Sequence, residues 1–277
     1  MTWAARRVPA GSGRLNMRWS STCSGPRRRS GCLKSAPGSW RRGLPESFSA
    51  YDLRSMMSNR RSCSTWRLYA IVDRAALGSR DPVETALAAS RGGADVIQLR
   101  DKSGTARWLM ETAAMLLPQL RRLGVPLMIN DRIDIVQLVG ADGVHLGQED
   151  LPVAQARKLL GPSRLIGKST HSLEQALSAA SEPVDYLAVG PIFATPTKPD
   201  YGSVGLELIG SVAGRVNHSV VCIGGIEEGN VQAVRQAGGR CVAVVRAICA
   251  AADPEQAART LKRHLTQSRR TTTKATV

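Results

Sequence analysis

The segment DVIQLRDKSGTARWLMETAAMLLPQLRRLGVPLMIND, residues 95–131, contains the pattern that decides the fold. It begins with a mostly apolar run at 95–100 and ends with a second one at 126–131, and apolar residues recur at helical spacing over 106–124. Short apolar runs have the length of strands that are buried on both faces, whereas the spacing between them is typical of an amphipathic helix. Two such strands joined by a helix form a parallel β-α-β unit. The segment therefore predicts one repeat of a parallel α/β protein.

The same pattern continues on both sides of this segment. Eight apolar runs occur in total, each followed by a helical stretch, at 68–73, 95–100, 126–131, 143–147, 165–170, 186–193, 220–225 and 241–248. Eight parallel strands with covering helices in about 200 residues favour a closed (β/α)8 TIM barrel. No GxGxxG follows the first strand, which argues against a doubly wound dinucleotide domain and leaves an open flavodoxin-like sheet as the alternative. We therefore predict a barrel domain over residues 67–265.

The two ends of the chain differ from this middle part in charge. The formal net charge is +16, yet residues 1–66 hold thirteen of the 38 Lys and Arg residues and only two of the 22 acidic ones. Their Arg, Ser, Gly and Pro content and lack of periodicity predict a disordered basic leader. Residues 266–277 are predicted to be a disordered basic tail.

Three interpretations of the leader stay open. Arg-rich, Ser-rich and acid-poor composition is typical of an organelle transit peptide. Alternatively, the start is assigned too far upstream and translation begins at Met56 or Met57, or the leader is an arm that binds nucleic acid or a membrane surface. The chain has no apolar run long enough to span a membrane, and its six cysteines form no CxxC pair. We therefore expect reduced thiols and a cytoplasmic protein, or an organellar one if the transit peptide is genuine.

Polar residues at the ends of the strands are the candidate site, because barrel chemistry lies at the carboxyl ends of the strands. Gln98, Arg100 and Lys102 alternate at the end of the second strand, so their side chains point to one side. Two cations and an amide suit an anionic substrate. The alternative is a structural ion-pair network across the barrel.

Two carboxylates follow the next two strands. Asn130 and Asp131 end the third strand, and Asp150 comes shortly after the fourth. Oxygen ligands near Lys and Arg suit Mg²⁺ that carries a phosphorylated ligand. The alternatives are an acid and base pair, as in glycoside hydrolysis, or, for Asp150 alone, a cap on the helix that begins near Pro152.

The remaining strands end in residues that suit phosphate groups. Hydroxyl side chains, a lysine and a glycine pair make a phosphate cradle, and barrels often bind phosphate after strands seven and eight. These residues are Ser169, Thr170 and His171 after strand five, Thr195, Pro196, Thr197 and Lys198 after strand six, Gly224 and Gly225 after strand seven, and Val245 and Arg246 in strand eight.

The two histidines of the barrel region are weaker candidates. His145 lies within an apolar run, which favours a core histidine that packs and hydrogen bonds there. His171 lies at the start of a predicted helix, where its side chain is expected to cap that helix or to pack against it. Ser169 lacks both a partner acid and a G-x-S-x-G turn, so a hydrolase triad is not expected.

Six motifs in order carry a resemblance to a known family. They are IQLRDK (97–102), INDR (129–132), DGVHLGQEDLP (142–152), IGKSTHS (166–172), GPIFATPTKP (190–199) and IGGI (223–226). Together they resemble the thiamine phosphate synthase family, also called thiamine-phosphate pyrophosphorylase, from about Tyr69 to Leu265. The resemblance implies a Mg²⁺-dependent transferase. It would join hydroxymethylpyrimidine diphosphate to hydroxyethylthiazole phosphate and release thiamine phosphate and pyrophosphate.

The resemblance also implies roles for individual residues. Arg100, Lys102 and Lys198 would be catalytic, Asp131 and Asp150 would bind Mg²⁺, the pyrimidine diphosphate would contact Gln98, Arg100, Lys102, Asn130, Ser169 and Lys198, and the thiazole phosphate would contact Thr195, Pro196, Thr197, Gly225, Val245 and Arg246. Two positions depart from the family pattern. Arg246 stands where members often carry Ser, and Lys168 where an apolar residue is more usual.

Two other functions are alternatives to thiamine phosphate synthesis. A thiazole tautomerase resembles the family in fold, but it needs no diphosphate site, so Gln98, Arg100, Lys102, Asp131 and Asp150 argue against it. A non-catalytic nucleic-acid binder would use the basic leader. We expect two phosphorylated small molecules as partners, with no membrane and no nucleic acid; a homo-oligomer is compatible with the fold.

Overall fold

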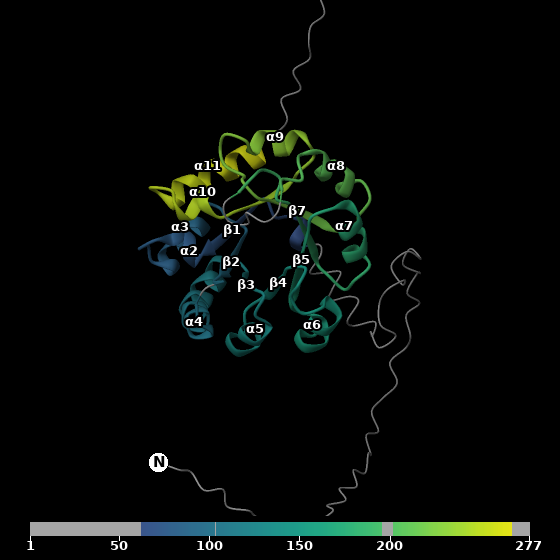
Figure 1. The fold of residues 1–277 in the computed structure, drawn as a ribbon. Helices are drawn as coiled ribbons and strands as arrows, with labels where there is room; N and C mark the ends of the chain where they lie inside the picture. The colour runs from purple at the N-terminus through teal and green to yellow at the C-terminus, as the bar shows by residue number, and fades with distance from the viewer. Residues whose placement is uncertain (1–61, 103, 196–201, 268–277) are drawn as a thin grey trace, which may run out of the picture. The chain divides into compact units, whose positions relative to one another are not determined.

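The computed structural model describes residues 62–102, 104–195 and 202–267. In this part of the chain eight parallel strands close into a barrel in chain order, with β8 hydrogen bonded to β1 (Figure 1). The strands are β1 (Leu68–Asp73), β2 (Val96–Arg100), β3 (Leu127–Asn130), β4 (Gly143–Leu146), β5 (Leu165–Thr170), β6 (Tyr186–Val189), β7 (Ser219–Ile223) and β8 (Cys241–Val244). The predicted (β/α)8 TIM barrel is confirmed, and the open sheet is wrong.

Helices surround the barrel and alternate with its strands (Figure 1). Local sequence signals set several helix starts, because a side-chain oxygen there accepts an otherwise unpaired backbone N–H. Asp81, Ser172 and Asp253 cap their helices in this way, each accepting from the N–H three residues later. The helices are α2 (Arg74–Leu77), α3 (Pro82–Arg91), α4 (Ala106–Leu123), α5 (Ile133–Val139), α6 (Val153–Leu160), α7 (Leu173–Ala180), α8 (Glu207–Ala213), α9 (Val231–Gln236), α10 (Arg246–Cys249) and α11 (Pro254–Thr266).

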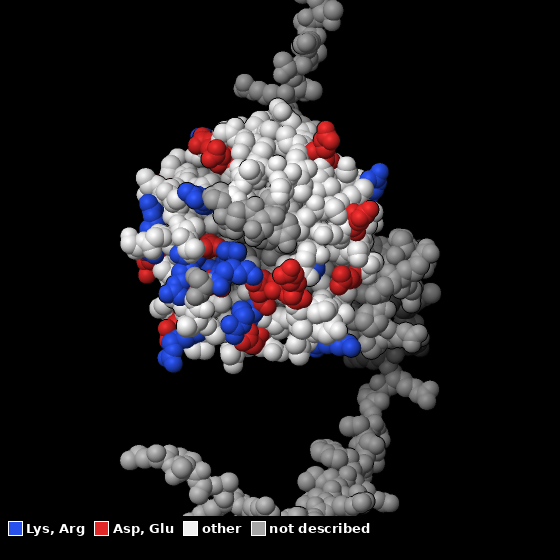
Figure 2. Space-filling view, in the orientation of Figure 1, with Lys and Arg blue, Asp and Glu red and all other residues white. Residues whose placement is uncertain are grey.

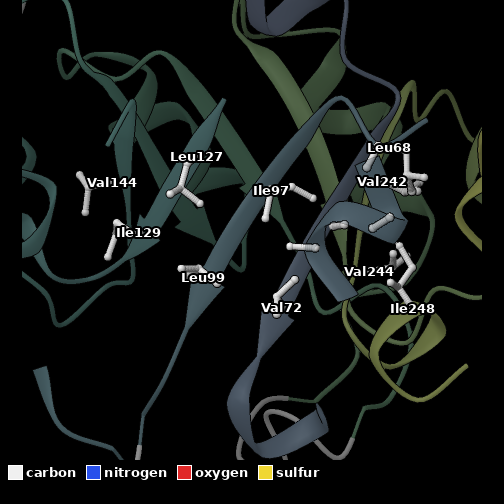
Figure 3. Packing of buried hydrophobic residues seen from close by; sticks show 14 of the residues in the cluster. Leu68, Val72, Ile97, Leu99, Leu127, Ile129, Val144, Val242, Val244 and Ile248 are labelled. Atoms are coloured by element: carbon white, nitrogen blue, oxygen red, sulfur yellow. The ribbon is translucent and has the colours of Figure 1, made fainter. Parts of the chain in front are cut away.

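The apolar residues of each strand divide between two cores. In β1, Leu68 and Val72 pack in the larger cluster, which also contains the buried helix residues, whereas Tyr69 and Ile71 pack in a second cluster inside the barrel. Figure 3 shows the larger cluster, where side chains such as Ile97 and Leu127 from neighbouring strands lie side by side. Both strand faces are therefore buried, which explains why the strand sequences are continuously apolar rather than alternating.

Aspartates just before three strands join the amino ends of neighbouring strands. Asp95 accepts from the backbone N–H of Leu68, and Asp142 accepts from that of Leu127, at 2.9 and 2.8 Å. Asp185 accepts in the same way from the backbone N–H of Ile166, at 2.7 Å. These N–H groups lie before the first hydrogen bonds between β1 and β2, between β3 and β4, and between β5 and β6. The carboxylates therefore satisfy donors that would otherwise be unpaired.

The core begins earlier than predicted. Trp66, which the sequence assigned to the leader, is buried against the rings of Tyr69 and Tyr186, with centroid separations of 6.0 and 5.4 Å. Cys63 lies in the same cluster. A single aromatic residue outside a strand or helix has no periodicity, so composition alone could not detect this contact. Residues 1–61 of the predicted leader, and the tail after Gln267, lie outside the described residues and remain predictions. No helix in the described part of the chain combines the length and apolar content that a membrane crossing requires.

Strand eight also ends sooner than its apolar run. The prediction placed Arg246 in a strand over 241–248, but β8 ends at Val244 and Arg246 starts the single helical turn α10. Val245 leaves the extended conformation, with a ψ of −79°. The prediction was wrong here because a short buried helical turn and a buried strand are equally apolar.

Candidate active site

A cavity of about 440 Å³ opens at the carboxyl ends of the strands. Lys and Arg side chains gather beside Asp and Glu side chains on this molecule, in the part of Figure 2 where Figure 1 labels β2, β3 and β4. Eleven predicted site residues line the cavity: Gln98, Arg100, Asn130, Ser169, Thr170, His171, Thr195, Gly224, Gly225, Val245 and Arg246. Residues that are far apart in the sequence are thus brought around one space.

The side chains at the end of β2 lie differently from one another. Gln98 is buried and Arg100 is nearly so, and both face the cavity. Arg100 forms an ion pair with Asp73 at the end of β1. An ion pair, which the sequence analysis gave as the alternative to a binding site, is therefore present at the cavity wall. Lys102 follows the end of β2, is 54% exposed and pairs with Asp131. Of the two cations, Lys102 is therefore the more accessible to a ligand from solvent.

Asp131 adopts a backbone conformation that is uncommon for a residue other than glycine. Its φ is 61°, in the left-handed region, and its N–H donates to the carbonyl of His145 at 2.8 Å, which ties the end of β3 to β4. Burial, followed by the hydrogen bond with Asp150, raises the pKa of Asp131 to about 6, although Lys102 opposes the shift. Strained backbone of this kind often occurs at functional sites, where surrounding contacts hold it.

Asp150 lies within hydrogen-bonding reach of Asp131 and does not cap α6. Its carboxylate accepts from the N–H of Gly147 at 2.6 Å, whereas α6 begins after Pro152 without a side-chain cap. The capping alternative is therefore wrong. Burial opposes ionisation of Asp150, but its hydrogen bonds with Asp131 and the Gly147 N–H, together with Lys102 and Lys168, lower its pKa. As the pH falls, Asp131 therefore takes up a proton before Asp150 does.

Lys168, one of the two departures from the family pattern, is buried and has a defined partner. Its ammonium group donates to the Gly147 carbonyl at 2.6 Å. Gln148 donates to the backbone carbonyl of Ser169, so two contacts hold the β4–α6 loop against β5. Lys168 therefore supports the loop that carries Asp150.

His145 is buried, as predicted, but it is also part of the cavity wall. Its Nε2 contacts the Ser169 hydroxyl at 2.9 Å, and its Nδ1 contacts the Tyr186 hydroxyl at 3.0 Å. Since a phenol stands where a triad would have a carboxylate, the arrangement does not match a hydrolase triad. The sequence analysis missed Tyr186 and its partner Tyr69, because both lie inside apolar strand runs that read as ordinary core.

The opposite side of the cavity is formed by close approaches of the backbone. Gly224 and Gly225 have φ values of 100° and 63°, and a Cβ on Gly225 would lie 2.7 Å from the Ala194 carbonyl oxygen. Such a cradle leaves backbone N–H groups accessible to a phosphate. Arg246 is exposed at the first position of α10, at the edge of the cavity. The predicted residues Pro196, Thr197 and Lys198 lie outside the described residues.

His171 has a structural role at this rim. Its Nδ1 contacts the carbonyl of Gly190, just after β6, and its N–H donates to Gln175 in α7 at 2.7 Å. The residue thereby ties the end of β5 to the end of β6, in agreement with the prediction that it packs at the start of a helix.

The carboxylates fit a magnesium ion that is also held by its ligand. Within the described residues, no group of three His, Cys, Asp or Glu side chains forms a metal site by itself. Asp131 and Asp150 supply two carboxylates within hydrogen-bonding reach of each other, and the Lys102 ammonium group beside Asp131 shows that positive charge is favoured there. One or two carboxylates together with substrate phosphates is the usual protein environment of Mg²⁺.

Comparison with known proteins identifies what the chain is similar to. The family model described as thiamine monophosphate synthase matches residues 68–248. The thiamine-phosphate synthase of Roseiflexus sp. (strain RS-1) is 46% identical over 195 residues, which cover 70% of this chain and 83% of the relative. That of Azorhizobium caulinodans is 46% identical over 204 residues, or 73% of this chain and 96% of the relative.

A solved structure supports the same comparison. The thiamine phosphate pyrophosphorylase from Pyrococcus furiosus superposes with a TM-score of 0.68 at 34% identity, over 73% of this chain and 96% of that one. The matched part of the chain is the barrel that contains the cavity.

Proposed function

The chain belongs to the thiamine-phosphate synthase family and is a transferase of thiamine biosynthesis, and we propose that the cavity joins hydroxymethylpyrimidine diphosphate to hydroxyethylthiazole phosphate with Mg²⁺ on Asp131 and Asp150. The observation that carries the proposal is the cluster of Lys102, Asp131 and Asp150 beside a cavity lined by Arg100. The comparisons support neither the tautomerase nor the nucleic-acid binder.

The diphosphate would bind at the β2, β3 and β5 side of the cavity. Arg100 and Lys102 provide cationic donors that suit phosphate oxygens. Asn130 adds a buried amide nitrogen, which has no hydrogen-bond partner among the described residues although it lines the cavity. A buried donor without a partner is costly unless a ligand accepts from it. Ser169 completes this proposed subsite.

The reaction would need no nucleophile from the protein. The carbon–oxygen bond to the diphosphate breaks as the thiazole nitrogen forms a bond to the same pyrimidine methylene carbon, and pyrophosphate leaves with the bonding electrons. Arg100, Lys102 and, by resemblance, Lys198 would stabilise the negative charge that develops on the leaving group. Mg²⁺, when bound, would neutralise part of the same charge. Holding both substrates in one cavity supplies a further rate gain.

The thiazole phosphate would bind on the opposite side of the cavity. Gly225 and Val245 offer backbone N–H groups, and Thr195 and Arg246 lie at the same rim. The roles of Pro196, Thr197 and Lys198 rest on the family resemblance. The proposed partners are therefore two phosphorylated small molecules.

The metal assignment has a direct test. A chain that begins at Ser62, and so keeps Cys63 and Trp66 in the core, should form thiamine phosphate from the two substrates when Mg²⁺ is present. Activity should disappear with a chelator and return when Mg²⁺ is added in excess. Product formation that a chelator does not diminish would show that Asp131 and Asp150 have another role.

The expected location in a reducing compartment is also part of the proposal. Mass spectrometry of the native N-terminus separates the three interpretations of the leader. A start at Met56 or Met57 indicates an upstream assignment error, a cleaved end indicates a transit peptide, and an intact leader indicates a retained arm.

A further inference from the structure

Five buried polar side chains form a continuous hydrogen-bonded chain inside the barrel. Gln98 Nε2 donates to the Tyr69 hydroxyl at 2.6 Å, and the Tyr69 and Tyr186 hydroxyls lie 2.9 Å apart. Tyr186 then contacts His145, which contacts Ser169, at 3.0 and 2.9 Å. Gln98, His145 and Ser169 line the cavity, so both ends of the chain reach the space proposed for substrate.

Counting protons along this chain gives it a direction. Tyr69 already accepts from Gln98, so its single hydroxyl proton is available for Tyr186. When Tyr69 donates to Tyr186, the Tyr186 proton goes to His145 Nδ1, which leaves the ring proton on Nε2. His145 Nε2 in turn donates to Ser169, whose own proton is available for a ligand. In the opposite direction Tyr69 would accept from both Gln98 and Tyr186, and its own proton would have no acceptor in this network unless the Gln98 amide turned around. In the favoured direction the Gln98 end presents an acceptor and the Ser169 end presents a donor.

The rings that carry this chain are held from several sides. Tyr186 stacks on His145 at an interplanar angle of 23° and meets Trp66 edge to face. A Cβ at position 167 would lie 2.1 Å from the Tyr186 ring, so Gly167 leaves the room that the ring occupies. Burial, the largest cause, raises the pKa of the Tyr69 and Tyr186 hydroxyls, so both stay protonated at physiological pH. The packing and the protonation state therefore keep the chain intact.

We propose that Tyr69, Tyr186 and His145 are positioning residues that set the hydrogen-bonding direction of the substrate contacts: Ser169 donates its hydroxyl proton to the pyrimidine diphosphate and Gln98 presents its carbonyl oxygen to it. In this arrangement His145 carries its ring proton on Nε2 and accepts from Tyr186 at Nδ1. The identity of the substrate at this end rests on the proposed function, whereas the direction of the chain does not.

The tautomer of His145 is measurable without any substrate. Nitrogen NMR of the whole chain, uniformly labelled, distinguishes a protonated from an unprotonated ring nitrogen, and comparison with His145→Gln assigns the signal among the four histidines. We expect an unprotonated Nδ1 and a protonated Nε2. A proton on Nδ1, or on both nitrogens near neutral pH, would overturn the proposed direction.

Tyr186→Phe tests the link to substrate binding, because it keeps the ring and removes the hydroxyl. The KM for the pyrimidine diphosphate should rise about tenfold, the scale of one lost hydrogen bond in a buried site, while the KM for the thiazole phosphate stays unchanged. The NMR signals of His145 should also change from one tautomer to a mixture. An equal rise in both KM values, or an unchanged tautomer with unchanged KM values, would contradict the positioning role.

A matched control removes another buried hydroxyl. Thr85 lies in α3 and does not line the cavity, and its hydroxyl donates to the Asp81 carbonyl at 2.8 Å. Thr85→Val should leave the His145 tautomer and both KM values unchanged. If Tyr186→Phe fails to fold, the tautomer in the unmodified chain still decides the direction. If the unmodified protein forms no thiamine phosphate, the proposed function fails, but the NMR result still tests the direction of the hydrogen bonds between the five side chains.

Discussion

Two ion pairs at opposite ends of the barrel use the same chemistry in different ways. Arg157 in α6 and Asp185 before β6 pair at 2.6 Å near the amino ends of the strands, with side-chain exposures of 1% and 0%. Lys102 and Asp131 pair at the carboxyl ends, with exposures of 54% and 18%. The first pair is sealed inside the protein, whereas solvent and ligands reach the second.

The two pairs also differ in what else they contact. Arg157 donates to the backbone carbonyls of Pro183, Gly161 and Arg164, and Asp185 accepts from the Ile166 N–H. Buried charges with several backbone partners of this kind hold loops in place. Asp131 instead faces a second carboxylate, and its pKa is raised. The comparison teaches that an ion pair with several backbone partners has a structural role, whereas one with a like charge beside it is a candidate for a ligand site.

The largest expected effect is on stability, at the buried pair. Asp185→Ala should lower the free energy of unfolding by about 3–5 kcal/mol, because it leaves the Arg157 charge buried without its partner. Denaturant titration measures the loss. Asp134→Ala, which breaks the exposed pair with Arg132, is the control and should cost less than about 1 kcal/mol. Equal losses in the two variants would remove the distinction between the pairs.

The next effect is on catalysis, at the pair of Lys102 and Asp131. Asp131→Ala should lower kcat by at least about a hundredfold, or about 2.7 kcal/mol, because it removes a proposed ligand of Mg²⁺ beside the leaving group. Thermal unfolding should change little, since Asp131 is not part of the core. Steady-state kinetics and the melting temperature are measured on the same preparation. A variant that unfolds, or one that stays fully active, would assign Asp131 a structural role like that of Asp185.

The third effect is a pH dependence confined to the exposed pair. The pKa of Asp131 is raised to about 6, so its carboxyl must lose a proton to bind Mg²⁺. Below that value the apparent Mg²⁺ affinity should fall by about tenfold per pH unit, and calorimetry measures it. Without Mg²⁺ the sign for stability is reversed: the raised pKa contributes stability at low pH that is lost as pH rises through about 6. An affinity that is flat between about pH 5 and 7 would contradict the raised pKa of Asp131.

The smallest effect is expected at Arg246. Its exposed guanidinium lies at the cavity rim on the proposed thiazole phosphate side, where solvent screens its charge. Arg246→Ser should therefore raise the KM for the thiazole phosphate only about threefold and leave the other KM unchanged. Arg107→Ser, at an exposed pair on α4, is the control for loss of positive charge. Equal changes in both KM values would count against a contact specific to one substrate.

The sequence by itself predicted the barrel and the positions that surround its cavity. Each strand and helix has a local periodicity that depends only on which faces are buried, so eight repeats were sufficient for the topology. The placement of Gln98, Asn130 and Ser169 at the cavity followed from parallel strands, whose carboxyl ends lie together. The identity of the substrates and the separate roles of these residues were inferred from the family resemblance.

The tertiary structure alone decided which polar groups meet. Apolar periodicity carries no information about contacts between residues 117 positions apart, such as the hydroxyls of Tyr69 and Tyr186. Nor could it show that Asp150 accepts from Gly147 rather than capping α6, or that Trp66 packs against Tyr186. These contacts depend on how far the strands are staggered as the barrel closes, and that stagger is a property of the closed sheet rather than of any one segment.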